Sequence, residues 1–482
     1  MFQKAKNRLR RLLPKNAFAR GVSVLVGGTA GAQVLTVLAA PLLTRLYSPE
    51  DFGLLAVYAS LLALIAVISS LRYELAIPLP EDDGEAANVA ALSLILVGLS
   101  ALLAGVLVWR LGPAIADLLG VPALAGYLWL LPVGVLLSGA YQVFNYWAVR
   151  TKRFTTIAGT RLRQALATIA IQLAAFKLGG IALLFGQAAG QSVGTTSLGR
   201  PALASAGFRQ VSWRGIARAA GRYQRFPIFT TWAGLVNTAG HQLPPMMFAA
   251  FFSAGAAGLY ALAHRLLMLP SNLIGSAIGS VFLSHAADAH RNASLGALYA
   301  KLQDKLIQIG LPPAVFLIVI GPDLFEVIFG ANWRTAGYFA QWLAAGAFAG
   351  FIVSPLSMVF SILEKQDAGL MLQLNLFFLR LAAITIGASF SDLLLTVALY
   401  SAASLLGYLA YVMAMSRITC VSLRRFGVSF VKSICYSLLA VSPIALVQYN
   451  GSAGSNAPML IAALMSTSIL LARYQAVARQ HV

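Results

Sequence analysis

Long apolar runs separated by short polar segments fill the chain from residue 21 onward. A helix that crosses a membrane needs about 20 mostly apolar residues, within a range of roughly 17–25. This length rule predicts about fourteen membrane-spanning helices, at 21–46, 51–71, 86–110, 120–149, 154–176, 179–198, 227–251, 256–285, 304–322, 335–363, 368–390, 393–416, 432–449 and 457–473. The pattern therefore predicts an all-α polytopic membrane protein.

The composition supports this class of protein and excludes others. The chain is 59% hydrophobic and only 10% charged, against roughly 25% charged residues in an average soluble domain. Its formal charge of +20 is spread between the apolar runs and forms no soluble basic domain, so we expect no nucleic-acid partner. Cys420 and Cys435 form neither a disulfide framework nor a metal-ligand cluster, so we expect no metal.

The distribution of lysine and arginine predicts the topology. If the N-terminus is cytoplasmic, 27 of these residues fall on the inner side and 4 on the outer side. Such an inner excess follows the positive-inside rule and places both termini in the cytoplasm. The uncharged run from Gly21 to Thr44 is longer than a signal-peptide core of roughly 7–15 residues, so we expect an uncleaved first helix.

Two pairs of similar segments indicate an internal repeat. "SPEDFGLL" at 48–55 resembles "SAGAAGLY" at 253–260, and "LLGVPALAGY" at 118–127 resembles "IFGANWRTAGY" at 328–338. The paired segments occupy equivalent topological places, which predicts two six-helix lobes around a central cavity. The expected parts are a basic cytoplasmic N-terminus (1–20), an N-lobe (21–198), a basic cytoplasmic linker helix (199–226), a C-lobe (227–416) and two additional C-terminal helices (417–482).

The linker between the predicted lobes carries six arginines and no acid. Four of them, Arg214, Arg218, Arg222 and Arg225, follow one stripe of a helix. The stripe indicates either an interfacial helix lying on anionic lipid of the inner leaflet or an ordinary positive loop.

Four arginines lie inside predicted spans: Arg161, Arg163, Arg265 and Arg380. A charge in hydrocarbon is costly, so such residues usually face a water-filled cavity and mark a transport path. No Asp or Glu lies as deep in the predicted spans, so the unbalanced positive charge predicts an anionic cargo. Arginine suits phosphate because its planar fork donates two parallel hydrogen bonds.

Each of these arginines also has an alternative role. Arg380, the deepest, either binds cargo phosphate or holds backbone carbonyls in a structural contact. Arg265 and Arg163 either face the cavity or snorkel toward the membrane surface. Arg161 and Arg163 point to different sides of one helix because they are two residues apart, so we do not expect both to bind one phosphate.

Polar residues at helical spacing mark further candidates for cargo binding. In lipid, such a stripe faces either another helix or a water-filled path, and we expect these stripes to line one cavity. The candidates are Gln33 in the first span, Tyr141 and Asn145 in the fourth, Gln164 in the fifth, and Asn237 and His241 in the seventh. Pro244, Pro245 and Pro270 break helical hydrogen bonding and are candidates for bending a span.

The segment "LLTRLYSPEDFGLLAVYASLLALIAVISSLRYELAIPLPEDDGEAANVAALSL" at 42–94 resembles the N-terminal signature of bacterial polysaccharide flippases. These are the O-antigen and exopolysaccharide exporters of the multidrug/oligosaccharidyl-lipid/polysaccharide, MATE-like transporter superfamily. The most specific part is "RYELAIPLP", from Arg72 to Pro80. Segments 258–282 and 328–344 are similar to later blocks of the same family.

The resemblance implies an alternating-access transporter and not an enzyme. Its cargo would be an undecaprenyl-pyrophosphate-linked oligosaccharide, moved from the cytoplasmic to the periplasmic leaflet of the bacterial inner membrane for O-antigen or exopolysaccharide biosynthesis. The polysaccharide polymerase and glycosyltransferases of the same pathway are candidate partners. The alternative is a multidrug or metabolite exporter of the same superfamily fold.

Arg72 and Glu74 fall at the inner mouth within this signature. They either pair and position the second helix, gate the inner opening, or form an exposed pair of little energetic value. We expect no buried carboxylate, since all fifteen acids fall in predicted loops or near span ends. His241 is then the titratable group in mid-span, with either a proton-carrying or a structural role. We expect no cofactor, and coupling to H⁺ or Na⁺ stays open.

Overall fold

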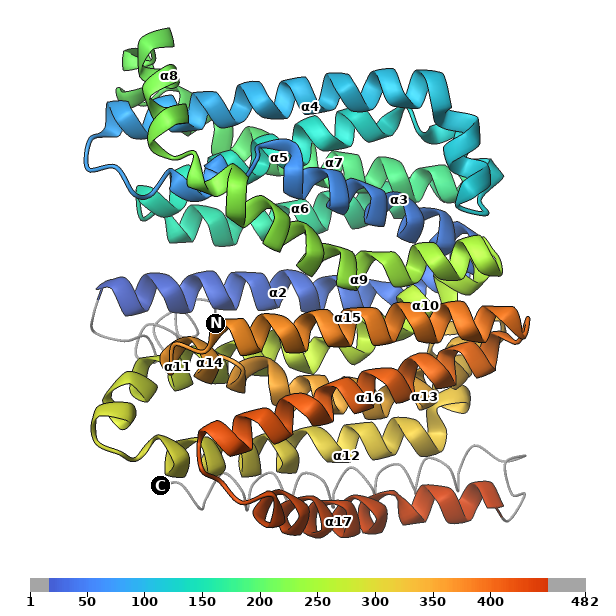
Figure 1. The fold of residues 1–482 in the computed structure, drawn as a ribbon. Helices are drawn as coiled ribbons and strands as arrows, with labels where there is room; N and C mark the ends of the chain where they lie inside the picture. Colours follow the sequence, from blue (N-terminus) through green and yellow to red (C-terminus); the bar gives the residue numbers. More distant parts are fainter. Residues whose placement is uncertain (1–16, 450–482) are drawn as a thin grey trace, which may run out of the picture. The chain divides into compact units, whose positions relative to one another are not determined.

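The computed structural model describes residues 17–449, and within this range the chain is helical and contains no strands (Figure 1). The predicted all-α fold is confirmed. The chain divides into two compact units, Met1–Gly258 and Leu259–Val482. The predicted span at 457–473 lies outside the described residues, as does most of the predicted basic N-terminus.

The first unit contains eight helices of ten residues or more among its described residues. They are α2 (Ala17–Leu46), α3 (Pro49–Ser69), α4 (Asp83–Leu118), α5 (Leu130–Arg150), α6 (Phe154–Ala174), α7 (Gly180–Leu203), α8 (Trp213–Arg222) and α9 (Thr231–Phe251). Short 3₁₀ turns precede four of them: η1 (Tyr73–Ala76), η2 (Pro122–Tyr127), η3 (Phe176–Leu178) and η4 (Gly207–Gln210). A π-helical turn, η5 (Phe226–Thr230), leads into α9.

Helix α9 packs on α3 inside the first unit. The repeat pattern assigned this segment to the second lobe. A boundary between sequence repeats and a boundary between packed units are different properties, so the predicted lobe limits stay a prediction.

Capping chemistry explains where the helices of the first unit begin. The Ser48 side chain accepts a hydrogen bond from the Asp51 amide while Asp51 accepts one from the Ser48 amide, which is a capping box, and Pro49 opens α3. Asp82 caps α4 by accepting from the Glu85 amide at 2.8 Å. Because these caps fix where α3 and α4 begin, they also fix where the short polar turns before them end.

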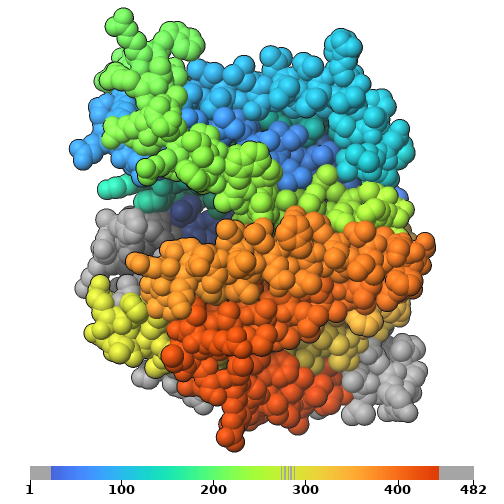
Figure 2. All heavy atoms as spheres, in the orientation of Figure 1, coloured from blue at the N-terminus to red at the C-terminus, as the bar shows by residue number. Residues whose placement is uncertain are grey.

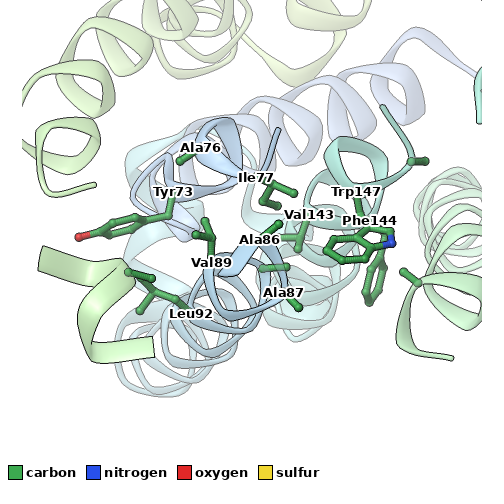
Figure 3. Packing of buried hydrophobic residues seen from close by; sticks show 14 of the residues in the cluster. Tyr73, Ala76, Ile77, Ala86, Ala87, Val89, Leu92, Val143, Phe144 and Trp147 are labelled. Carbon is green, nitrogen blue, oxygen red and sulfur yellow. The ribbon is translucent and has the colours of Figure 1, made fainter. Parts of the chain in front are cut away.

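The core of the first unit gathers around η1 and the cytoplasmic ends of α4 and α5, as the topology predicts them (Figure 3). Ala86, Ala87 and Val89 of α4 are fully buried against Val143 and Phe144 of α5. Side chains of η1 also belong to this cluster, so the turn between α3 and α4 is part of the packed interior.

Helices α6 and α7 pack through small residues, as helices in membranes commonly do. A methyl group at Gly186, Gly190 or Gly194 of α7 would overlap Gln172, Thr168 or Gln164 of α6. The close approach sets polar groups of α6 against the backbone of α7, and the Gln172 amide donates to the Leu183 carbonyl at 3.2 Å.

The second unit contains most of α10 (Ala254–Leu267) and the helices that follow it. These are α11 (Ser276–Arg291), α12 (Leu295–Phe329), α13 (Arg334–Leu356), α14 (Val359–Ile362), α15 (Gln366–Ser389), α16 (Leu393–Ile418) and α17 (Leu423–Tyr449). Two short turns lie between them, η6 (Ser271–Gly275) and η7 (Ala331–Trp333). Helix α13 packs on α12 and α16, α15 packs on α16, and α17 packs on α12.

The prediction of one continuous helix over 256–285 is wrong. Helix α10 ends at Leu267, and the π-helical turn η6 separates it from α11. The break includes Pro270, whose ring removes a backbone donor and crowds the preceding turn. Pro270 thus lies within this break, and its role in bending or gating stays a prediction.

Eight described helices are long and apolar enough to cross a membrane. They include α2, α3 and α4 in the first unit and α12, α15, α16 and α17 in the second. Helices α5, α6, α7 and α9 fall below the same limits, and three of these four carry the predicted polar stripes. Most of the candidate residues thus lie on helices that fall below these limits, whereas Gln33 on α2 and Arg380 on α15 lie on helices that meet them. The chain is a multi-pass membrane protein.

Candidate functional site

The turn between α3 and α4 adopts an unusual backbone conformation. Leu71 and Arg72 have φ values of 50° and 62°, which is the left-handed region for two consecutive residues that are not glycine. Each such residue costs about 1–3 kcal/mol and persists only where the surrounding structure enforces it. Such strain is common at functional sites.

Glu74 follows in η1 and its side chain is buried, with the residue 3% exposed. The Ser70 hydroxyl donates a hydrogen bond to Glu74 Oε2. Arg72 Nη1 lies 3.7 Å from Glu74 Oε1. The predicted pairing of Arg72 with Glu74 is therefore confirmed, whereas both the reading as an exposed pair and the expectation of no buried carboxylate are wrong.

Arg72 packs against the first turns of α9. A Cβ atom built on Gly234 would lie 2.8 Å from Arg72 Nε and 3.0 Å from Cζ, so the guanidinium occupies the space that a side chain at 234 would need. Arg72 Nε is buried, and no described residue accepts a hydrogen bond from it. Tyr146 on α5 lies near both Arg72 and Glu74.

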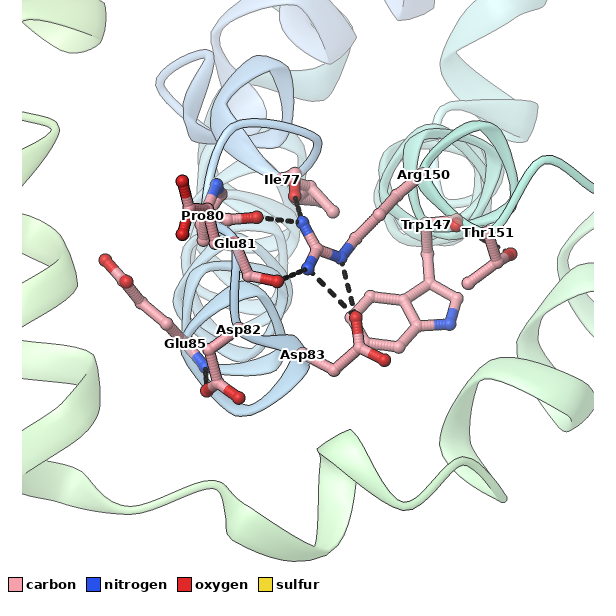
Figure 4. Close-up of polar contacts among 9 residues, drawn as sticks. All are labelled: Ile77, Pro80, Glu81, Asp82, Asp83, Glu85, Trp147, Arg150 and Thr151. Atoms are coloured by element: carbon pink, nitrogen blue, oxygen red, sulfur yellow. Dashed lines mark hydrogen bonds and ion pairs between the residues drawn. The ribbon is translucent and has the colours of Figure 1, made fainter.

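Arg150, at the end of α5, holds the same turn in place (Figure 4). Its Nη2 donates to the Glu81 carbonyl at 3.0 Å, its Nη1 donates to the Pro80 carbonyl, and both Nε and Nη2 reach Asp83 Oδ1. The sequence showed Arg150 only as one positive charge of a cytoplasmic loop. Two features of the sequence could have indicated this contact: Arg150 falls at the end of a predicted span, and the acidic residues 81–83 fall in a turn on the same predicted side.

Helix α8 docks on the N-terminal end of α4, next to the α3–α4 turn (Figure 2). The Ser212 amide donates to Asn88 Oδ1 at 3.0 Å, Arg222 pairs with Glu85 at 2.8 Å, and the Tyr73 hydroxyl donates to the Ala220 carbonyl at 3.0 Å. A cavity of about 580 Å³ opens between the two helices. It is lined mainly by Asp82, Glu85, Asn88, Gln210, Arg218 and Arg222.

The opposite side of α8 is exposed. Trp213 is 78% exposed and Arg214 is exposed beside it. Arg218, which lines the cavity, and Arg225, which follows the end of α8, are exposed as well. The predicted helix in the linker is confirmed over Trp213–Arg222, and one of its four striped arginines, Arg222, is paired with an acid.

The two arginines of α6 have different surroundings, as their spacing predicted. Arg161 is partly buried and donates to the Thr29 hydroxyl of α2 at 2.7 Å. Arg163 is exposed, and its Nε donates to the Gly159 carbonyl of its own helix at 3.3 Å. Gln164 and Tyr141 both lie against Gly194 of α7.

Two further candidates have buried acceptors that no described donor reaches. They are Gln33 Oε1 on α2 and Asn145 Oδ1 on α5. Asn237 and His241 are exposed on α9, whereas Pro244 and Pro245 are buried within it. Arg265 is exposed near the end of α10.

Arg380 lies on α15 in the second unit and is held by α16. Its Nε donates to the Ser404 hydroxyl at 2.9 Å and its Nη2 donates to the Tyr408 hydroxyl at 3.1 Å. The guanidinium carbon also lies 5.5 Å from the Tyr400 ring centre and 5.3 Å from the Tyr408 ring centre, within cation–π range. The hydroxyl partners, one turn apart on the next helix, were not among the sequence candidates.

The cavity beside Arg380 has a volume of about 20 Å³. A buried water needs at least roughly 10–15 Å³, so this space holds about one water molecule. A pyrophosphate does not fit there in this conformation. The assignment of Arg380 to cargo binding therefore stays a prediction that requires this cavity to widen.

A protein-family model described as polysaccharide biosynthesis protein matches residues 42–337. This match confirms the resemblance inferred from residues 42–94. A search of curated proteins finds no significant match.

Solved structures share the fold at low sequence identity. Lipid II flippase MurJ in its inward closed conformation aligns with a TM-score of 0.75 and 13% identity, covering 95% of this chain and 99% of that chain. An inward-facing multidrug resistance MATE family transporter of the MOP superfamily aligns with a TM-score of 0.61 and 14% identity, covering 83% and 96%. A MOP superfamily transporter from Pyrococcus furiosus aligns with a TM-score of 0.52 and 13% identity, covering 84% and 97%.

Proposed function

Because the chain belongs to the family of polysaccharide biosynthesis proteins and has the fold of membrane transporters, we propose that it is a flippase for a lipid-linked oligosaccharide. The cargo is an oligosaccharide joined by pyrophosphate to a polyprenol such as undecaprenol. Alternating access carries it from the cytoplasmic to the periplasmic leaflet of the bacterial inner membrane, for O-antigen or exopolysaccharide synthesis.

The observation that carries this proposal is the uncompensated positive charge in the spans. None of the ion pairs among residues 17–449 includes Arg161, Arg163, Arg265 or Arg380. Arg161 and Arg380 donate instead to neutral hydroxyls, which leave their net charge in place. A diphosphate would neutralise charge of this sign, whereas a cationic drug would be repelled by it.

The basic side of α8 supports a second part of the proposal. The exposed Trp213 and the arginines beside it suit an anionic inner-leaflet surface, because indole rings favour the membrane interface and each nearby arginine gains about 1 kcal/mol there. The chain would present its termini to the cytoplasm, where glycosyltransferases supply the cargo. A polysaccharide polymerase would receive it on the outer side.

The function can be tested in the bacterium that carries the gene, by replacing the gene with variants and measuring surface polysaccharide. Loss of a charge-assisted hydrogen bond costs about 1.5–3 kcal/mol, or roughly ten- to hundredfold. Arg161→Ala and Arg380→Ala should therefore each lower surface polysaccharide by about tenfold or more. Arg110→Ala, an exposed arginine at the outer end of α4, is the control and should leave it unchanged.

Protein level is measured in every strain by immunoblot. Normal polysaccharide in both variants at normal protein level contradicts the proposal. Export of a cationic dye by the wild type, without any change in polysaccharide when the gene is deleted, would instead favour the multidrug-exporter alternative.

A further inference from the structure

Glu74 is the buried acidic side chain among the described residues, and its partners satisfy it incompletely. The Ser70 hydroxyl donates to one oxygen. The other oxygen faces Arg72 at 3.7 Å, beyond the 2.7–3.2 Å of a normal hydrogen bond. Burying a carboxylate is unfavourable unless its partners are well placed, and here the contact with Arg72 is too long for a hydrogen bond.

Arg72 is also satisfied incompletely. Its Nε is buried with no hydrogen-bond acceptor among the described residues, and the same edge of the guanidinium packs on Gly234 of α9. The contact between the turn and α9 therefore depends on an arginine whose only carboxylate partner in the described structure is Glu74.

We propose that Glu74 is a proton-binding site, and that its protonation loosens the packing of Arg72 on the start of α9. In the charged state Glu74 holds Arg72 electrostatically. When a proton from the cytoplasmic side neutralises Glu74, Arg72 keeps its charge but loses its counter-charge. The guanidinium must then be hydrated, and because it packs against Gly234, water can reach it only if α9 moves away.

The groups around Glu74 favour a proton over a metal cation. Arg72 places a positive charge 3.7 Å from the carboxylate, which opposes a second cation. No cluster of three or more acidic, cysteine or histidine side chains with metal-binding geometry occurs among residues 17–449. The elements packed on η1 add Tyr146 from α5, the Gly234 backbone from α9, the Ala220 carbonyl from α8, and apolar side chains of α4.

The start of α9 is the part suited to move. It begins with the π-helical turn η5, which contains Pro227, and π turns often occur at functional sites. Ile228, Phe229 and Trp232 are all exposed, so this end of α9 is less tightly packed than Pro244 and Pro245 further along. A role of this movement in transport rests on the proposed function, whereas proton binding itself does not.

Distance measurement between two spin labels in the purified, nanodisc-reconstituted protein tests the proposal. Cys420 and Cys435 are first replaced by serine, and labels are attached at Leu79→Cys and Trp232→Cys, which are 60% and 64% exposed in the wild type. Double electron–electron resonance then records the distance distribution at a series of pH values. We expect two populations that exchange with pH, with the longer distance favoured in acid.

Glu74→Gln should remove this pH dependence and show the acidic distribution throughout. Glu81→Gln, an exposed acid in the same turn, is the matched control and should titrate as the wild type does. Glu74→Asp keeps a carboxylate and should titrate with a shifted midpoint, which provides a second test if Glu74→Gln does not fold.

A wild-type distribution that does not change with pH overturns the proposal. So does a pH dependence that is the same in the wild type and in Glu74→Gln, or in Glu74→Asp if that is the variant that folds. The measurement needs no cargo, so its failure leaves the flippase function standing. Conversely, a wild-type protein that shows the expected pH-dependent distance but moves no lipid-linked oligosaccharide would count against the proposed function alone.

Discussion

At the scale of single residues, the α3–α4 turn shows how sequence chemistry creates a site. Strained Leu71 and Arg72 are held because Arg150 binds the end of the same turn and η1 belongs to the core. The sequence suggested that Arg72 and Glu74 pair because they are close along the chain. Their burial was not predictable, because it depends on α5, α8 and α9, which come from distant parts of the sequence.

Gly234→Ala tests the close approach of Arg72 to α9. The added methyl group would overlap the guanidinium, and overpacking of this kind typically costs about 1–3 kcal/mol. Thermal unfolding in detergent, followed by intrinsic fluorescence, should show a lower midpoint. Gly31→Ala in α2 is the control, since nothing lies within 4 Å of its added methyl group, and it should be neutral or slightly stabilising. Equal midpoints for both variants would contradict the contact.

Arg150→Lys tests the clamp on the turn. Lysine keeps the charge but cannot donate to the Pro80 and Glu81 carbonyls and to Asp83 together, because it lacks the guanidinium fork. We expect a loss of about 1–2 kcal/mol, at the low end for charged hydrogen bonds because Asp83 is mostly exposed. Hydrogen exchange of residues 77–83 should become faster, while exchange in α7 should not change. Unchanged exchange across the turn would exclude the clamp.

At the scale of elements, hydrophobic run length predicted the place of most helices, but it misplaced an end of α4, α5, α12 and α17. The break between α10 and α11 was missed because the apolar run continues through Pro270, and run length does not register a local loss of hydrogen bonding. The arginine stripe of the linker predicted α8 as a helix. Its docking on α4 through Asn88 and Glu85 was not predictable, since neither residue carries a local signal of its partner.

A fluorescent probe attached at Trp213→Cys in the protein without its native cysteines tests the lipid contact of α8. In nanodiscs with anionic lipid, the probe emission should shift to the blue relative to zwitterionic nanodiscs, because the arginines draw α8 onto the charged surface. Arg214→Gln with Arg218→Gln should remove most of the shift. A probe at Leu118→Cys, exposed at the other end of α4, should not respond. A shift that persists without the arginines would contradict the electrostatic attraction of α8 to anionic lipid.

At the scale of the whole molecule, the chain combines a transporter fold with positive charge that no described carboxylate balances. Composition and run length were enough to predict the fold class, because hydrocarbon permits few architectures. The positions of Arg161 and Arg380 in spans were also visible in the sequence. Their hydroxyl partners, Thr29 for the first and Ser404 with Tyr408 for the second, required the packing of α2 on α6 and of α15 on α16.

Transport in proteoliposomes tests most directly whether this charge serves an anionic cargo. A fluorescent polyprenyl-pyrophosphate oligosaccharide is placed in both leaflets, and its accessibility to a membrane-impermeant quencher is followed over time. The wild-type protein should bring the inner-leaflet probe to the quencher, and the double variant Arg161→Ala with Arg380→Ala should slow this by roughly tenfold or more, while the corresponding lysine variants retain part of the rate. Equal rates in the wild type and in the double alanine variant would contradict the claim that the charge of Arg161 and Arg380 serves an anionic cargo.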